Sequence, residues 1–136
     1  MKSLKVALWV TAIGCLTAVP FIFLPWAAVE SIGSWFGIES LPDMPIAVYF
    51  FKVVFGVFGL IGVFFIILAR NPLKYGPMLN LGAFGLILFG LLALILGLSI
   101  GLPLIVYIGD GLSGLVLGIV ILVFSSRSKQ ALKTYR

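Results

Sequence analysis

Four long runs of apolar residues constrain the fold of this chain more than any other feature. They extend over residues 6–24, 46–69, 78–100 and 103–124. A helix needs about 20 residues to cross a hydrocarbon core of about 30 Å at about 1.5 Å per residue. Because no water at that depth can pair with backbone groups, each run is predicted to be a transmembrane helix.

The composition supports a membrane location and one domain. Of 136 residues, 62% are hydrophobic and 10% are charged, and the mean hydropathy is +1.30. Soluble chains have roughly 25% charged residues. We therefore expect an all-α integral membrane protein, a four-helix transmembrane bundle that forms a single domain over residues 1–136.

The charged residues outside the runs predict the orientation of the bundle. Eight of the nine basic residues fall on one side of it, namely Lys2, Lys5, Arg70, Lys74, Arg127, Lys129, Lys133 and Arg136. Three of the four acids fall in the opposite loop, residues 25–45. Because basic loops stay in the cytoplasm, both termini are expected there, with 125–136 as a basic cytoplasmic tail. Topology thus accounts for the net charge of +5, which indicates no nucleic-acid partner; the lipid bilayer is the expected surrounding.

The loop over residues 25–45 contains a second helical pattern. Trp26, Val29, Ile32 and Trp35 recur at helical spacing, which predicts a short amphipathic helix lying in the membrane interface. The acids of this loop, Glu30, Glu39 and Asp43, form a candidate outer-loop site for a cation or a lipid substrate. The alternative is that the loop only caps the outer mouth of the bundle.

Small residues at helical spacing predict where the helices touch. Glycines three or four residues apart let helix backbones approach closely in a membrane. They are Gly56, Gly59 and Gly62 in the second run, Gly82, Gly85, Gly97 and Gly101 along and just after the third, and Gly111, Gly114 and Gly118 in the fourth. These faces fit contacts within one chain and contacts between copies equally well. Pro20 is expected to kink the first helix, since proline removes a backbone hydrogen bond.

Two charged residues lie inside the predicted helices. Lys52 and Asp110 each stand about seven residues from the outer end of their run, so both lie about 10 Å deep. An unpaired charge at depth costs about 2.5–3.5 kcal/mol, so the two are expected to meet, with Tyr49, Tyr107 and Ser113 completing a candidate polar intramembrane site. Three interpretations stay open: a structural ion pair, a site for a small solute, proton or lipid headgroup, or a contact with a partner subunit.

The sequence lacks the residues of common catalytic and cofactor sites. It has no histidine, and Cys15 is its only cysteine, which excludes histidine-ligated haem, CxxC redox chemistry and Ser-His triads. The GxGxxG pattern at residues 109–114 lies inside a predicted span instead of after a strand. We therefore predict no catalytic residue, no cofactor site and no metal site.

Three segments carry a family resemblance, and they cover residues 35–43, 69–75 and 101–110. In sequence they are WFGIESLPD, ARNPLKY and GLPLIVYIGD. Together they resemble small bacterial four-helix membrane proteins of the BphX-like type, which are distantly similar to the DoxX-like group. The resemblance implies a four-helix fold in a bacterial inner membrane, and it implies no activity.

From these observations we expect a non-enzymatic membrane protein that acts by binding. It would serve as a subunit of a membrane assembly or as a homo-oligomer, with Lys52 and Asp110 as an intramembrane pair. The alternative is a small transporter or channel element that uses these two residues to pass a small solute, an ion or a lipid.

Overall fold

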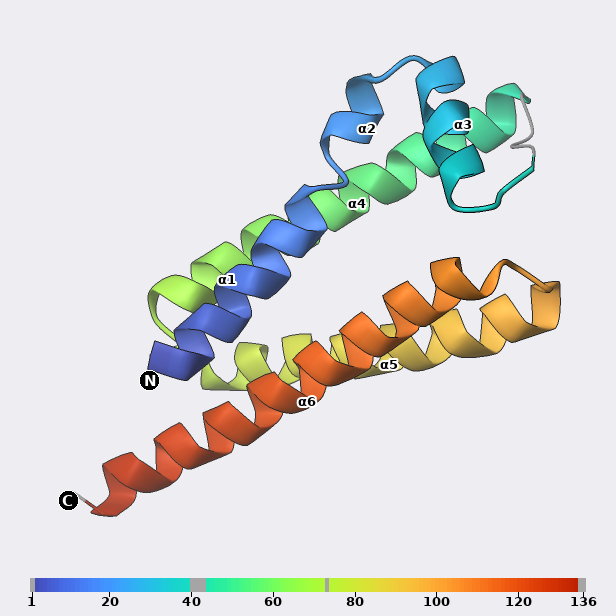
Figure 1. The fold of residues 1–136 in the computed structure, drawn as a ribbon. Coiled ribbons are helices and arrows are strands. Elements are labelled where there is room, and N and C mark those ends of the chain that lie inside the picture. The colour runs from blue at the N-terminus through green and yellow to red at the C-terminus, as the bar shows by residue number, and fades with distance from the viewer. Residues whose placement is uncertain (1, 40–43, 73, 135–136) are drawn as a thin grey trace.

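The computed structural model describes residues 2–39, 44–72 and 74–134, and every regular element in these ranges is a helix (Figure 1). The elements are α1 (Lys2–Leu16), α2 (Pro20–Phe23), α3 (Trp26–Trp35), α4 (Pro45–Arg70), α5 (Gly76–Ile100) and α6 (Leu104–Thr134).

Four helices are long and apolar enough to cross a membrane, as the sequence predicts. They extend over Lys2–Phe23, Pro45–Arg70, Gly76–Ile100 and Leu104–Ser128. The first span does not bend at a proline within one helix, as the expected kink implies: α1 ends at Leu16, residues 17–19 form a turn, and Pro20 begins α2. Proline suits the first position of a helix, where its missing N–H leaves no hydrogen bond unmade.

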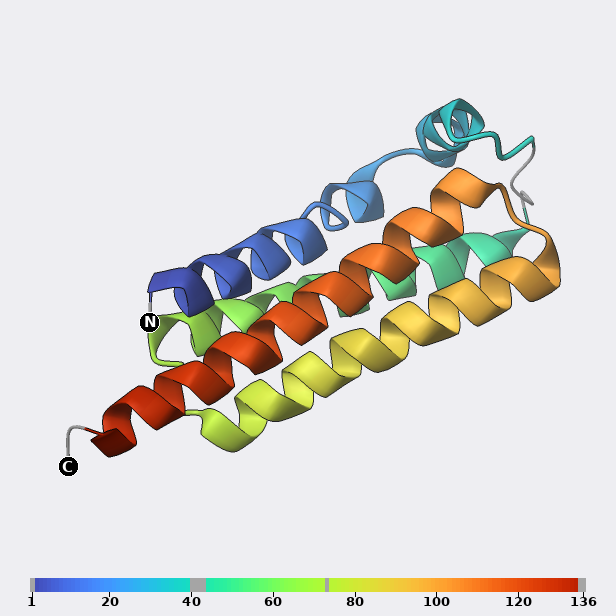
Figure 2. The same ribbon diagram turned by 60° about the horizontal axis from the view of Figure 1, so that its bottom comes forward.

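The four spans form two antiparallel hairpins, α1 with α4 and α5 with α6 (Figures 1 and 2). The hairpins meet where α1 packs on α6 and α4 packs on α5. Consequently α4 and α6 stand diagonally across the bundle. This arrangement decides which side chains of different spans can reach each other.

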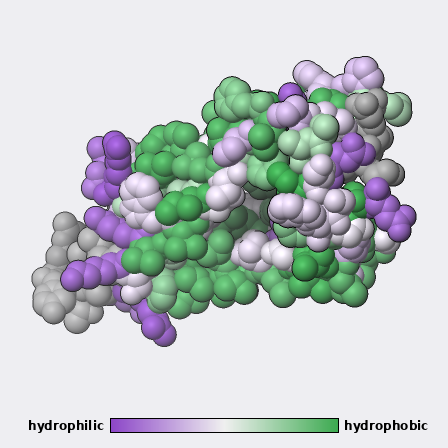
Figure 3. Space-filling model, turned by 45° about the horizontal axis from the view of Figure 1, so that its top comes forward, coloured by the Kyte–Doolittle hydropathy of each residue, from purple (hydrophilic) through white to green (hydrophobic). Residues whose placement is uncertain are grey.

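The buried core lies in the half of the bundle that contains both chain termini. It consists of Leu4, Ala7, Leu8 and Ala12 of α1, Phe65, Leu68 and Ala69 of α4, Leu79 and Ala83 of α5, and Ile121 of α6. We call this end the basic end, since Lys2, Lys5, Arg70, Lys74 and Arg127 lie there. The opposite end, with Glu30 and Glu39, is the acidic end. Figure 3 shows hydrophilic residues gathered at the two ends and a mostly apolar surface between them.

The α5–α6 hairpin is packed along a seam of small residues. On α6 the buried positions alternate in steps of four and three, and they are Tyr107, Gly111, Gly114, Gly118, Ile121, Ser125 and Ser128. On α5 the buried Gly76, Ala83, Gly90 and Gly97 recur every seven residues. These are the spacings of a left-handed helix pair. A Cβ added at Gly90 would stand 2.6 Å from the backbone oxygen of Gly111, so the two backbones nearly touch.

The α1–α4 hairpin uses the glycines of α4 in the same way. A Cβ at Gly59 would meet Val19, and one at Gly62 would meet Leu16, each at 2.8 Å. By contrast, added Cβ atoms at Gly85 and Gly109 would meet nothing within 4 Å. Most of the predicted glycine faces are therefore used within the chain, and Gly85 is left open on the surface of α5.

The segment after α2 forms α3, as its helical spacing predicts, and Val29 and Gly33 are buried there. Trp35, expected on the same face, is 83% exposed. The helix ends at Trp35, and Gly37 follows in the turn with a φ of +80° that suits glycine. A Cβ on Gly37 would lie 3.7 Å from Pro103. The turn after α3 thus touches the α5–α6 connection, joining the two hairpins at the acidic end.

Candidate functional site

Lys52 and Asp110 do not form the expected ion pair. Lys52 is half-buried on α4 and Asp110 is exposed on α6, and neither has a salt-bridge partner in the described part of the chain. Their levels do match, because Lys52 stands eighteen residues before the end of its span and Asp110 eighteen before the end of the other. At about 1.5 Å per residue, both lie about 27 Å from the basic end.

The helix arrangement explains why equal depth does not bring these residues together. Lys52 precedes Gly56 by four residues and Gly59 by seven, so it shares the α4 face that packs on Ile22 and Val19. It is therefore half-buried beside the α1–α2 segment, on the side of α4 away from α6. Asp110 belongs to α6, which stands diagonally opposite α4.

The side chains expected to complete the polar site are also dispersed. Tyr107 is 8% exposed because its ring packs against Gly97 of α5, and Tyr49 is 61% exposed on α4. Ser113 donates a hydrogen bond of 3.0 Å to the backbone oxygen of Asp110, not to its carboxylate. The carboxylate of Asp110 therefore lies on the surface of α6 without these partners.

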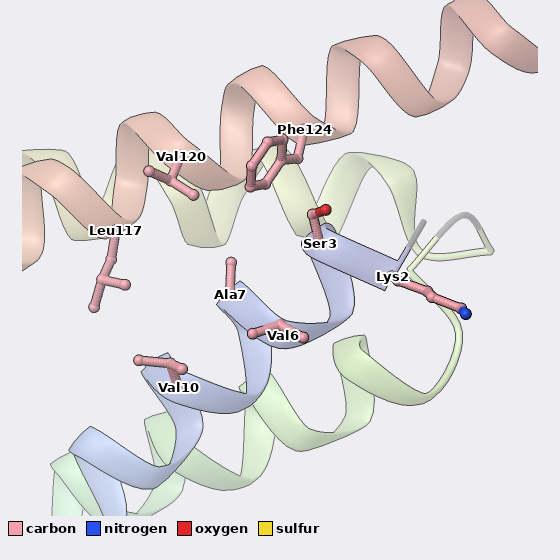
Figure 4. A pocket seen from close by; sticks show the side chains of 8 residues that line it. All are labelled: Lys2, Ser3, Val6, Ala7, Val10, Leu117, Val120 and Phe124. Atoms are coloured by element: carbon pink, nitrogen blue, oxygen red, sulfur yellow. The ribbon is translucent and has the colours of Figure 1, made fainter.

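A groove runs between α1 and α6, and its inner part is a pocket of about 450 Å³ (Figure 4). The pocket is lined by Lys2, Ser3, Val6, Ala7 and Val10 of α1 and by Leu117, Val120 and Phe124 of α6. Figure 4 shows Ser3 near Phe124, Ala7 below Val120 and Val10 below Leu117. Each step of three or four residues up α1 is thus matched by an equal step down α6, as in an antiparallel pair.

Polar residues lie farther along both helices, beyond the pocket lining. Gly14 and Thr17 follow Val10 by four and seven residues, and Ser113 and Asp110 precede Leu117 by four and seven. All four of these residues are exposed, so the helices no longer pack closely there. The Thr17 hydroxyl donates to the backbone oxygen of Gly14 at 2.6 Å, which leaves its oxygen free to accept. The outer groove therefore offers a carboxylate and two hydroxyl oxygens.

The candidate outer-loop site is not assembled in the structure. Glu30 is half-buried on α3, Glu39 is exposed beyond it, and Asp43 lies outside the described residues. Within the described ranges, no three acidic or thiol side chains come together as metal ligands would. In the described ranges, the indole Nε1 of Trp26 is the one buried side-chain nitrogen or oxygen atom without a hydrogen-bond partner. The Trp26 ring contacts Phe51, with 5.5 Å between the ring centroids.

The polar role of Thr17 and the groove lining were not predicted from the sequence. A signal was present, since Ser3, Ala7, Gly14 and Thr17 are small or polar residues on one face of the first span. Because nothing in the sequence states which helix packs beside α1, that face had no assignable partner.

No protein-family model, no curated protein and no solved structure matches the chain. The resemblance to the BphX-like type therefore stays a prediction, and the function has to be argued from the residues themselves.

Proposed function

We propose that the protein acts by binding inside the membrane as a homo-oligomer, in which Lys52 of one copy pairs with Asp110 of another. The observation that supports this is the pair of opposite charges at one level of the spans, each without an ion-pair partner in the described residues. Leaving both unpaired costs about 2.5–3.5 kcal/mol apiece. A contact between copies removes this cost for both residues.

The geometry of a membrane favours such a contact. Copies inserted with the same topology are related by an axis along the membrane normal, so residues of equal depth in one copy stay level between copies. A two-fold axis makes the interface self-complementary, which gives two reciprocal Lys52–Asp110 pairs. Gly109, adjacent to Asp110, has open space beside it and lets a neighbouring helix come close.

Complementation between two differently tagged copies tests the proposal. One copy carries Asp110→Lys and the other Lys52→Asp. Each alone places like charges opposite each other and should not self-associate, whereas the mixture restores opposite charges at both contacts and should copurify. A pair confined to one chain would not be restored by mixing.

Exposed charges outside the spans provide the matched control. Glu39→Lys and Lys74→Glu, in separately tagged copies, should leave self-association unchanged, because both residues are exposed near the ends of the bundle. The proposal is contradicted if the wild-type chain is monomeric in nanodiscs, or if the Asp110→Lys copy alone associates as well as wild type. In the monomeric case, copurification from native membranes tests a role as subunit of a different assembly.

The outer groove favours a second candidate, a small transporter or channel element. Its supporting observation is the exposed row of Thr17, Ser113 and Asp110 inside the apolar spans. A transport path has to be wet, whereas a docked helix excludes water. Ser113→Cys in a Cys15→Ala background should be labelled by a membrane-impermeant thiol reagent if water enters, and should stay unlabelled in the homo-oligomer.

For the location we propose a bacterial inner membrane with the basic end in the cytoplasm. The orientation rests on the positive-inside rule, because the described Lys2, Lys5, Arg70, Lys74 and Arg127 lie at the basic end. The bacterial inner membrane is what the resemblance to the BphX-like type implies. Under this orientation α3 lies at the outer membrane interface, where its exposed Trp35 suits the headgroup level.

A further inference from the structure

The inner part of the α1–α6 groove combines an apolar wall with a cationic mouth. Val6 and Val10 line it and are 60% and 52% exposed, so the groove opens sideways from the bundle. Leu117, Val120 and Phe124 form the opposite wall (Figure 4). At the level of the lipid tails, such an opening admits a hydrocarbon chain and has no group for a polar solute to bind.

Polar groups at the mouth are all suited to an anion. Lys2 and Ser3 line the pocket, and Arg127 is exposed one turn beyond Phe124. The Ser3 hydroxyl makes no hydrogen bond within the described part of the chain, unlike that of Thr11, which donates to Ala7. None of the described acidic residues, Glu30, Glu39 and Asp110, lies at this end, so an anion bound there meets no acidic side chain of the described ranges.

We infer that this groove binds an anionic phospholipid, with its phosphate at Lys2 and Ser3 and one acyl chain along Val6, Val10 and Leu117. The length fits, because the lining from Lys2 to Val10 covers eight helical steps of α1, about 12 Å. One leaflet contributes about half of the 30 Å hydrocarbon core, or about 15 Å. The site is separate from the Lys52 and Asp110 contacts, and it stands whether or not the chain associates with itself.

Native mass spectrometry of the purified full chain tests the site with three probes: dioleoyl-phosphatidylglycerol, dioleoyl-phosphatidylcholine and inorganic phosphate. The anionic phosphatidylglycerol should bind more tightly than the zwitterionic phosphatidylcholine. Inorganic phosphate alone should not displace the bound phosphatidylglycerol. One lysine near an anionic lipid surface contributes about 1 kcal/mol of binding free energy. The Lys2→Gln variant should therefore bind phosphatidylglycerol about fivefold more weakly.

Two matched variants separate this groove from the general surface of the protein. Lys5→Gln removes the same charge from the same helix without touching the pocket lining, and it should change binding less than twofold. Val10→Trp fills the groove and should abolish binding. Leu88→Trp adds the same bulk at a 61% exposed position of α5 and should not affect it.

Several outcomes overturn the inference. Equal losses for Lys2→Gln and Lys5→Gln mean diffuse attraction to a basic surface, and unchanged binding by Val10→Trp means that no acyl chain occupies the groove. Equal binding of the two lipids would show that the site does not select an anionic headgroup. Displacement of the lipid by phosphate would show that the site binds a free anion and not a phospholipid. Where Val10→Trp is not monodisperse, Val6→Trp replaces it with the same expected loss.

Discussion

Replacing Gly90 by alanine tests whether the α5–α6 seam is held by direct backbone contact. The new Cβ would stand 2.6 Å from the Gly111 oxygen and 2.8 Å from the Leu115 nitrogen. Both atoms belong to backbone, which cannot rotate away as a side chain can. To reach 3.0 Å, the shortest separation that real Cβ atoms show, the helices have to part by about 0.4 Å at this level.

The magnitude follows from two opposing effects. Overpacking of a close-packed interior costs about 1–3 kcal/mol, while alanine is favoured over glycine inside a helix by about 0.5–1 kcal/mol. Gly85→Ala is the matched control, since it lies five residues earlier on the same helix and its Cβ would meet nothing within 4 Å. The helix preference cancels between the two variants, so the free energies of unfolding should differ by about 1–3 kcal/mol, the range of the overpacking cost.

Unfolding by SDS titration, followed by circular dichroism in mixed micelles, gives the two free energies of unfolding. Gly85→Ala should be as stable as wild type or slightly more stable, and Gly90→Ala should be less stable. The reasoning is refuted if the two variants unfold alike, because the contact at Gly90 would then contribute nothing to the pairing of α5 with α6.

Two further predictions concern single positions. Trp26→Phe keeps the ring contact with Phe51 and removes a buried N–H that has no hydrogen-bond partner. We expect the free energy of unfolding to stay unchanged or to rise, by up to about 1–3 kcal/mol. A clear loss of stability in the same SDS titration would show that the indole N–H does have a partner. Gly101→Ala forces a residue with a Cβ into a φ of +74° just after α5, which should lower the free energy of unfolding by about 1–2 kcal/mol. Gly109→Ala is the control, because Gly109 lies within α6 and a Cβ there would meet nothing within 4 Å. This control should not lower the stability of the protein.

The helices could be predicted from the sequence because hydrocarbon imposes a simple rule. Each span has to be apolar for about 20 residues and has to satisfy its own backbone, so the spans follow from composition. The packed side of a helix follows a different rule. In α6 the residues around the helix are apolar on nearly every side, and the buried side is marked by small residues, Gly111, Gly114 and Gly118. The spacing of these glycines predicted that side correctly.

The choice of neighbours could not be predicted in the same way. Lys52 and Asp110 were expected to meet because they lie at one depth, but depth fixes only one of the three coordinates of a side chain. The other two depend on which helices are adjacent and on how each is rotated, and both are decided by contacts such as Gly59 with Val19. Those contacts place α4 beside α1, so Lys52 lies on the side of α4 next to the first span and away from α6.

The distribution of packing bears on both proposed binding sites. The core cluster lies in the basic-end half, and at the acidic end Gly37 approaches Pro103 between the two hairpins. Helices that diverge leave polar positions such as Thr17 and Asp110 exposed, which costs stability for an isolated chain in lipid. A second copy covering Asp110 would recover that cost, and a lipid in the inner groove would fill the space where α1 and α6 begin to part. Both proposed sites therefore lie where exposed side chains of this chain leave room for a second molecule.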